Sequence, residues 1–306
     1  MKDLNTFPEF KQLSFSDAEW YQNYYKNFPP YADHYFGNLF AWLNFHDDLN
    51  ISTLNNNILF RYMDVFDPSN HSFSYTIIGD NEPESTFDTF YSQNDNKNVK
   101  FHMVPEMLVK NINQTLYQVS EDRDSWDYIY NIENFIHLDG PEYRRLRYQI
   151  RTFDKENGNN SSLISYNVED EKDNPVLLST FKSWKNVYQF GNDPEEIETH
   201  AMQERILNYQ HIPFNCLQYF YKNKLSGFVI YSYPPQNEYA IIHHLKCSYE
   251  LEYMFDYIFF EALKLFHKDG KKYLNLEQDL GKPGLRKHKE LLRPERYLKK
   301  YIVKKS

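Results

Sequence analysis

Apolar and polar residues alternate along three short stretches of the first half of the chain, as is typical of half-buried β-strands. This pattern predicts strands over residues 58–64, 73–79 and 99–105. Between the last two, residues 85–93 place their aromatic side chains at helical spacing, which predicts a short helix. The first half therefore predicts the order strand, strand, helix, strand.

The second half of the chain repeats this order. Residues 225–233 and 239–246 have the pattern of strands, and residues 253–267 have their apolar residues at helical spacing. Residues 272–278 then predict a further strand. A repeat of this kind predicts a two-lobed protein of the α/β (α+β) class.

The lobe boundary is expected in the polar, charged stretch 120–125. We therefore predict an N-terminal lobe of residues 1–124 and a C-terminal lobe of residues 125–306, which carries the candidate site. Each lobe is expected to be a mixed sheet flanked by helices.

Charge is distributed unevenly over the 306 residues. The net charge is −9, but residues 282–306 contain ten Lys and Arg against two Glu, so the rest of the chain carries −17. A basic end on an acidic body indicates a local anion-binding surface, and the alternative is a solvated basic tail. Only 9 glycines are present, which weakens the case for a phosphate-binding glycine loop.

Several classes of protein are not expected from this sequence. Two cysteines, Cys216 and Cys247, form no disulfide framework, and no spacing typical of a metal site includes His243 or His244. No apolar run is long enough for a transmembrane helix, and the first residues lack the apolar core of a signal peptide. We expect a cytoplasmic protein without a metal. No feature of the sequence predicts the oligomeric state.

Residues 140–153 predict a helix with Pro141 in its first turn. At about 100° per residue, Arg144, Arg147 and Arg151 share a face beside the apolar seam. Arginine binds phosphate and carboxylate through two parallel hydrogen bonds, so these residues are candidate substrate-binding groups. The alternative is that they pair with the acidic body of the same protein.

The C-terminal segment repeats this arrangement of cations. Arg286, Lys289 and Arg293 fall at i, i+3 and i+7 on a predicted helix that Pro294 terminates. If this cationic face converges with that of residues 140–153, the two together form an anion site. The alternative is a salt-bridged tail.

Polar side chains at the end of the last predicted strand are candidate site residues, with Glu277 and Asp279 as catalytic groups and Asn275 as a substrate-binding group. On a strand, Asn275, Glu277 and Asp279 share one face. Two carboxylates can perform general acid and base catalysis when their environments separate their pKa values, and the alternative is a pair of structural anions. Glu277 is the stronger candidate base because it lies nearer the apolar part of the strand.

Two adjacent histidines, His243 and His244, lie in a predicted strand and should face opposite ways, so that one is buried. His243 is a candidate general base, and the alternative is a core histidine that bonds a backbone carbonyl. No GxSxG signature occurs, so nucleophilic hydrolysis is not expected.

The C-terminal residues carry a family resemblance. Asn275–Gly281, Gly284–Lys289, Arg293-Pro294 and Lys299–Val303 resemble an uncharacterised bacterial family related to the C-terminal catalytic domain of phosphatidylglycerol lysyltransferases. Phe36–Trp42 and the arginine-rich helix are similar to the same family, so that the resemblance spans nearly the whole chain. The resemblance implies two tandem acyltransferase-like (GNAT-type) lobes. In the lysyltransferases the donor is an aminoacyl-tRNA and the acceptor is a lipid head group.

Two departures from the family pattern change what is expected. The chain has no membrane-spanning segment, which puts a lipid acceptor in doubt. The connection at 247–252, where acetyl-CoA users of this fold carry a glycine-rich loop, contains no glycine and two acids. Acidic side chains there would repel a pyrophosphate, which disfavours acetyl-CoA.

The leading hypothesis is therefore an acyltransferase that moves an aminoacyl group from aminoacyl-tRNA to an amine or a hydroxyl. The cations Arg144, Arg147, Arg286 and Lys289 would bind donor phosphates or a carboxylate. Glu277 or His243 would take the acceptor's proton. One alternative is a CoA-dependent N-acyltransferase with acyl-CoA as donor. The other is a non-catalytic ligand-binding or interaction protein that kept the fold.

Overall fold

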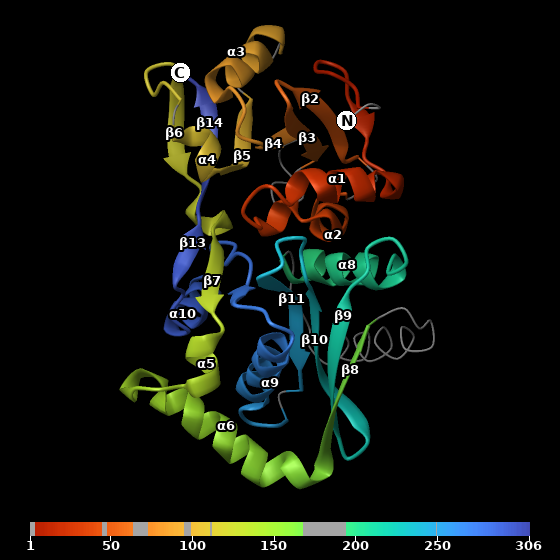
Figure 1. The fold of residues 1–306 in the computed structure, drawn as a ribbon, viewed down its shortest axis with the longest axis vertical. Coiled ribbons are helices and arrows are strands. Elements are labelled where there is room, and N and C mark those ends of the chain that lie inside the picture. The colour runs from red at the N-terminus through yellow and green to blue at the C-terminus, as the bar shows by residue number, and fades with distance from the viewer. Residues whose placement is uncertain are drawn as a thin grey trace. The chain divides into compact units, whose positions relative to one another are not determined.

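The computed structural model describes residues 4–44, 48–63, 73–94, 99–110, 112–167, 194–248 and 250–306. The chain divides into two compact units whose segments interleave along the sequence. The first unit comprises residues 1–128, 192–204 and 278–306, and the second comprises residues 129–191 and 205–277. There are two seven-stranded mixed sheets (Figure 1).

The first sheet has the strand order β1-β2-β3-β4-β5-β14-β6. Its inner strand β14 comes from the end of the chain and pairs antiparallel with both β5 and β6 (Figure 1). The elements of this unit are, in chain order, β1 (Lys11–Gln12), α1 (Ala18–Tyr25), α2 (Phe36–Asn38) with a π-helical turn (Leu39–Leu43), β2 (Asn50–Leu54), β3 (Asn57–Met63), β4 (Phe73–Ile78), α3 (Pro83–Gln93), β5 (Lys100–Pro105), α4 (Glu106–Val109), β6 (Tyr117–Glu121), α10 (Pro283–Leu291), β13 (Arg296–Leu298) and β14 (Lys300–Lys305).

Both faces of the first sheet are covered, because successive residues of a strand point to opposite sides. On β3, Leu59 joins a core cluster that includes Phe87 and Phe90 of α3. The next residue, Phe60, contacts Tyr21 of α1 on the opposite face, with ring centroids 5.9 Å apart. Strand β3 therefore has a nearly continuous apolar sequence instead of a clean alternation.

The second sheet has the order β13-β7-β12-β11-β10-β9-β8. Strands β11 and β12 are parallel and are joined by helix α9, which forms a βαβ unit. The remaining elements are, in chain order, β7 (Asp127–Asn131), α5 (Glu133–His137), α6 (Arg144–Asn157), β8 (Ser161–Asn167), α8 (Pro194–Leu207), β9 (Asn215–Tyr221), β10 (Lys224–Ser232), β11 (Tyr239–Cys247), α9 (Met254–Lys268) and β12 (Tyr273–Asn275).

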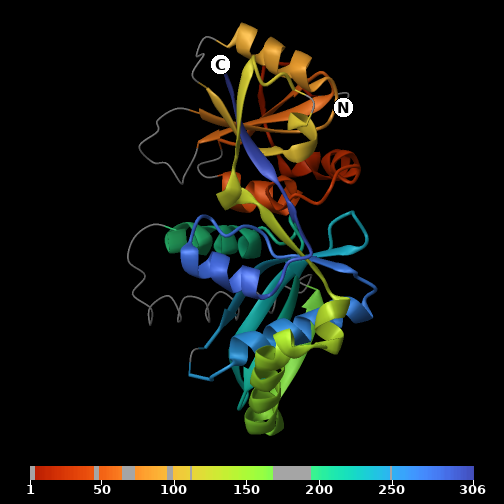
Figure 2. The same ribbon diagram turned by 90° about the vertical axis from the view of Figure 1, so that its left-hand side faces the viewer.

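Helix α9 is the central helix of the second unit. It packs on β10 and β11, and α5 and α6 pack on it in turn (Figure 2). Phe153 of α6 and Tyr257 of α9 form the contact between these two helices, with ring centroids 4.7 Å apart. Helix α6 thus lies with one face on α9 and its other face outward.

The predicted order of elements is confirmed in both halves, as β3-β4-α3-β5 and as β10-β11-α9-β12. The predicted lobe boundary between residues 124 and 125 stays a prediction. In the described part of the chain, no helix combines the length and the apolar character that crossing a bilayer requires.

Three predicted elements end at other residues than expected. Strand β12 ends at Asn275, because the Asn275 side chain accepts the backbone N–H of Glu277 at 2.7 Å and Glu277 adopts a left-handed φ of 55°. Helix α10 ends at Leu291, so Arg293, with φ 59°, lies beyond it. Helix α6 continues past Phe153 to Asn157.

Candidate functional site

A row of three hydrogen-bonded side chains links neighbouring strands of the second unit. Glu277, two residues after β12, has its Oε1 atom 2.8 Å from Nδ1 of His243 on β11. Nε2 of His243 is in turn 3.0 Å from Oγ of Ser232, the last residue of β10. The row runs from a buried serine through a buried histidine to a carboxylate whose side chain is 14% exposed. Glu277 is therefore the member that faces outward.

A β-bulge places His243 in this row. Ile230 pairs with His244 and Tyr231 with Ile242, so the pairing register of the two strands shifts by one residue at His243. A bulge interrupts the alternation of a strand and redirects side chains. Both His243 and His244 are buried, so the prediction that only one of the two would be buried is wrong.

Burial decides the protonation of His243. Burial, followed by the nearby charge of Arg205, lowers the pKa of His243 well below its usual range, so the ring is neutral at physiological pH. A neutral imidazole has one N–H, and an ionised carboxylate can only accept. We therefore assign the proton to Nδ1, which donates to Glu277, while Nε2 accepts from the Ser232 hydroxyl.

The backbone also holds Glu277 in place. A left-handed φ is uncommon for a residue with a side chain and persists where neighbouring contacts determine it. Here the contact is the hydrogen bond from the Glu277 amide to Asn275, which is itself fully buried between β7 and β11. Asn275 thus positions the candidate base through the main chain.

Asp279 belongs to the first unit and is surrounded by donors. Its buried carboxylate accepts from Tyr128 at 2.5 Å, from Arg123 at 3.0 Å, and from Arg286 at 2.8 and 2.9 Å, as well as from the amide of Gly281. Burial alone would raise the pKa of Asp279, but the hydrogen bonds from Arg286 and Tyr128 hold it below its usual value. This is the environment of a structural anion, and a catalytic role of Asp279 stays a prediction.

The prediction that Asn275, Glu277 and Asp279 share one face of a strand is wrong. It required a strand through residue 278, whereas β12 ends at Asn275. Once Glu277 turns to a positive φ, the two-residue period no longer determines where the side chains point.

The cations of the C-terminal segment have partners inside their own unit. Arg286 binds Asp279 and also Asp124 at 2.5 Å. Lys289 is buried, and its Nζ donates to the backbone oxygen of Gln278 at 2.5 Å. Arg293 is exposed and lies beyond the helix on which it was predicted.

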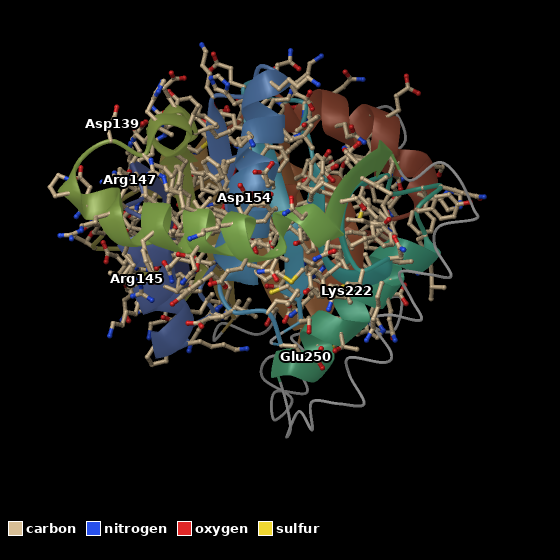
Figure 3. All side chains as sticks on the ribbon, turned by 90° about the horizontal axis from the view of Figure 1, so that it is seen from below. Asp139, Arg145, Arg147, Asp154, Lys222 and Glu250 are labelled. Atoms are coloured by element: carbon tan, nitrogen blue, oxygen red, sulfur yellow. The ribbon has the colours of Figure 1, made fainter. Side chains whose placement is uncertain are left out.

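The three arginines of α6 differ from one another. Arg147 donates to the backbone oxygens of Leu138 and Gly140 and so stabilises the turn that precedes the helix. Arg144 and Arg151 are exposed and form no ion pair with any residue that the structure describes. Figure 3 shows α6 from its outer side, with Arg145 and Arg147 on opposite edges of the helix.

The predicted convergence of the two cationic sets stays a prediction. Arg144, Arg147 and Arg151 lie in the second unit, and Arg286, Lys289 and Arg293 lie in the first. Ser232 was missed by the sequence reasoning, because a single serine at the end of an apolar strand has no pattern that marks it. Only the pairing of β10 with β11 brings it to His243.

The connection between β11 and α9 has the features expected from its sequence. The amide of Ser248 donates to the backbone oxygen of Ser226, and the amide of Glu250 lies 3.3 Å from the Ser248 hydroxyl. The amide of Met254, the first residue of α9, donates to Leu251. These backbone donors are used within the protein, so they are not available to hold a pyrophosphate.

The described residues include no group of three or more His, Cys, Asp and Glu side chains that could hold a metal ion. The row Ser232–His243–Glu277 offers a carboxylate with an ordered histidine behind it. Such a pair can accept a proton from an amine or a hydroxyl.

A comparison with protein families places this site in context. Residues 28–304 match the family described as phosphatidylglycerol lysyltransferase, C-terminal. The chain belongs to this family. No curated protein matches the sequence.

Members of this family and other solved structures share the fold at low sequence identity. A conserved protein of unknown function from Bacteroides thetaiotaomicron has a TM-score of 0.81 at 18% identity, over 97% of this chain and 99% of that one. L-PGS from Bacillus licheniformis has a TM-score of 0.57 at 14% identity, covering 90% and 89%. FemX has 0.59 at 9% identity, covering 97% of both chains. The predicted α/β class, with mixed sheets flanked by helices, is confirmed.

Proposed function

We propose that this protein transfers an aminoacyl group from an aminoacyl-tRNA to an amine or a hydroxyl, with Glu277 as the general base. The observation that carries the proposal is the row Ser232–His243–Glu277, which holds a partly exposed carboxylate beside the end of β12. Membership in a family described by its lysyltransferase activity supports the reaction class.

The reaction uses the groups of the row in a definite order. The carboxylate of Glu277 removes a proton from the acceptor as the acceptor's nitrogen or oxygen attacks the ester carbon of the donor. The carbon–oxygen bond to the ribose breaks, and the proton passes from Glu277 to the leaving ribose oxygen. His243 keeps its proton on Nδ1 throughout and orients the carboxylate, and Ser232 maintains this tautomer.

The connection between β11 and α9 favours this donor over acyl-CoA. The amides of Ser248, Glu250 and Met254 bond within the protein, and the connection carries the carboxylates of Glu250 and Glu252. A CoA pyrophosphate needs free amides and would meet negative charge instead. The family description names a lysyl group and phosphatidylglycerol. Lysyl-tRNA is therefore the first donor to test, and phosphatidylglycerol is the first acceptor.

The test is transfer of a radiolabelled amino acid from lysyl-tRNA and other aminoacyl-tRNAs to amines, hydroxyl compounds and phosphatidylglycerol micelles. Glu277→Gln should lower the single-turnover rate about 10²- to 10⁴-fold, because the amide cannot accept the proton. Ser232→Ala should lower it less, because it removes only the outer hydrogen bond of the row. Glu238→Gln, at an exposed carboxylate of the same unit, is the matched control and should keep the wild-type rate.

Three results would contradict the proposal. A Glu277→Gln protein with a rate within twofold of wild type would exclude Glu277 as the base. Transfer from acetyl-CoA in the absence of transfer from any aminoacyl-tRNA would favour the CoA-dependent alternative. Absence of transfer from every donor would favour a ligand-binding or interaction protein.

A further inference from the structure

The outward face of α6 carries a row of four side chains. Arg144, Tyr148, Arg151 and Lys155 occur at i, i+4, i+7 and i+11, so at 100° per residue they lie within about 60° of one another. All four are exposed, and Tyr148, at 61%, is among the most exposed large side chains of the described residues. We call this set the α6 row.

The cations of the α6 row are not neutralised by ion pairs in the part of the chain that the structure describes. Arg144, Arg151 and Lys155 form no ion pair within the described parts of the chain. Asp154 lies on the Arg147 side of the helix in Figure 3, about 60° to 100° away from the three cations of the row. Like charges on neighbouring turns destabilise a helix by a few tenths of a kcal/mol per pair, so an external anion would stabilise this arrangement.

We propose that the α6 row is a docking surface for the phosphodiester backbone of RNA. This inference rests on the proposed function, and it assigns the surface that would bind the donor RNA outside the reacting group. At 1.5 Å per residue the row is about 16 Å long, which lets its three cations face successive phosphates along a strand. Arginine forks bind phosphate oxygens in pairs, and the exposed Tyr148 ring can stack on a base.

The structure favours RNA over a membrane surface as the partner. A helix that lies in a membrane interface inserts its apolar face between the lipids. In α6 the residues of that face, Ile150 and Phe153, are buried in the second unit against α9. The face that remains outward offers charges and one aromatic ring and no apolar surface to insert.

The test measures binding without turnover. A fluorescein-labelled RNA hairpin with a CCA 3′ end is titrated with the full chain at 50 to 200 mM KCl and followed by anisotropy. Arg144→Ala/Arg151→Ala should bind about tenfold more weakly, with the slope of log Kd against log salt lower by about 2. Lys222→Ala/Lys224→Ala removes the same charge from exposed positions of the same unit and should bind like wild type. Tyr148→Ala should weaken binding without changing the slope.

Two outcomes would overturn the inference. One is an unchanged affinity and salt slope for Arg144→Ala/Arg151→Ala. The other is wild-type protein that floats with phosphatidylglycerol vesicles and does not bind the hairpin, which would assign the row to an anionic membrane. Glu277→Gln should bind RNA like wild type. A Glu277→Gln protein that keeps its transfer rate would therefore refute the proposed base and leave the RNA surface standing. Conversely, transfer from aminoacyl-tRNA by the wild type, together with unchanged RNA binding by Arg144→Ala/Arg151→Ala, would refute the RNA surface and leave the proposed function standing.

Discussion

Glu277 and Asp279 are two carboxylates separated by one residue, and their surroundings give them different properties. Glu277 accepts an N–H from a neutral histidine and keeps part of its side chain exposed. Asp279 is fully buried and accepts from two guanidinium groups and a phenol. The exposed part of Glu277 fits its proposed role as a base, whereas the donors around Asp279 fit a structural role.

Replacing Asp279 should show this structural role. Asp279→Asn keeps the shape but removes the charge that Arg123 and Arg286 face, so we expect a loss of about 2 to 3 kcal/mol in the free energy of unfolding. Urea unfolding measures it. Asp154→Asn, at an exposed carboxylate, is the control and should change this free energy by less than about 0.5 kcal/mol.

The same residue predicts a pH dependence. Because the folded-state pKa of Asp279 is lowered, its contribution is present above the unfolded-state value of about 3.9 and is lost as the pH falls through the folded-state value. Wild type should therefore lose more stability than Asp279→Asn between pH 6 and pH 3. Parallel losses in the two proteins would contradict a folded-state pKa below the usual one.

Helix α6 shows how one element separates its two roles by face. Its inner residues, which include Phe153 and Ile150, pack in the core of the second unit, and its outer residues form the α6 row. Arg147, between the faces, bonds to the carbonyls of the preceding turn. The sequence pattern identified the helix and both faces, but the roles of the individual arginines needed the contacts.

Removing the buried ring of Phe153 should lower the free energy of unfolding more than removing the exposed ring of Tyr148. Phe153→Ala leaves a cavity beside Tyr257 and should lower the free energy of unfolding by about 3 to 4 kcal/mol. Hydrogen exchange should be faster in α6 and in the part of α9 that it covers. Tyr148→Ala, on the outer face, should change the stability by less than about 0.5 kcal/mol. Equal effects of the two substitutions would refute this orientation of the helix.

At the scale of the whole molecule, the order of segments in the sequence differs from their order in the sheets. The last strand, β14, lies inside the first sheet between β5 and β6. Its first residue, Lys300, is fully buried and pairs with Asp127, at 2.8 Å, and with Asp33. Burial alone would lower the pKa of Lys300, but Asp127 and Asp33 raise it. The end of the chain thereby joins segments far apart in the sequence.

Deleting residues 300–306 should therefore unfold the first unit. The deletion removes an inner strand, the buried Val303 and Lys300, which pairs with both Asp33 and Asp127. The expected loss exceeds about 5 kcal/mol, which is comparable to the whole stability of a typical domain. Circular dichroism and limited proteolysis measure it, with deletion of Ser306 alone as the control. A truncated chain that melts at the wild-type temperature would contradict this prediction.

The local patterns of the sequence determined the elements and their repeated order, because the strand and helix periods depend only on neighbouring residues. They also singled out Glu277, His243 and the arginines of α6. The tertiary structure alone decided that β12 ends at Asn275, that a bulge turns His243 toward Glu277 and Ser232, and that Arg286 and Lys289 are engaged within their own unit. These outcomes depend on pairing between segments far apart in the chain, which no local period encodes.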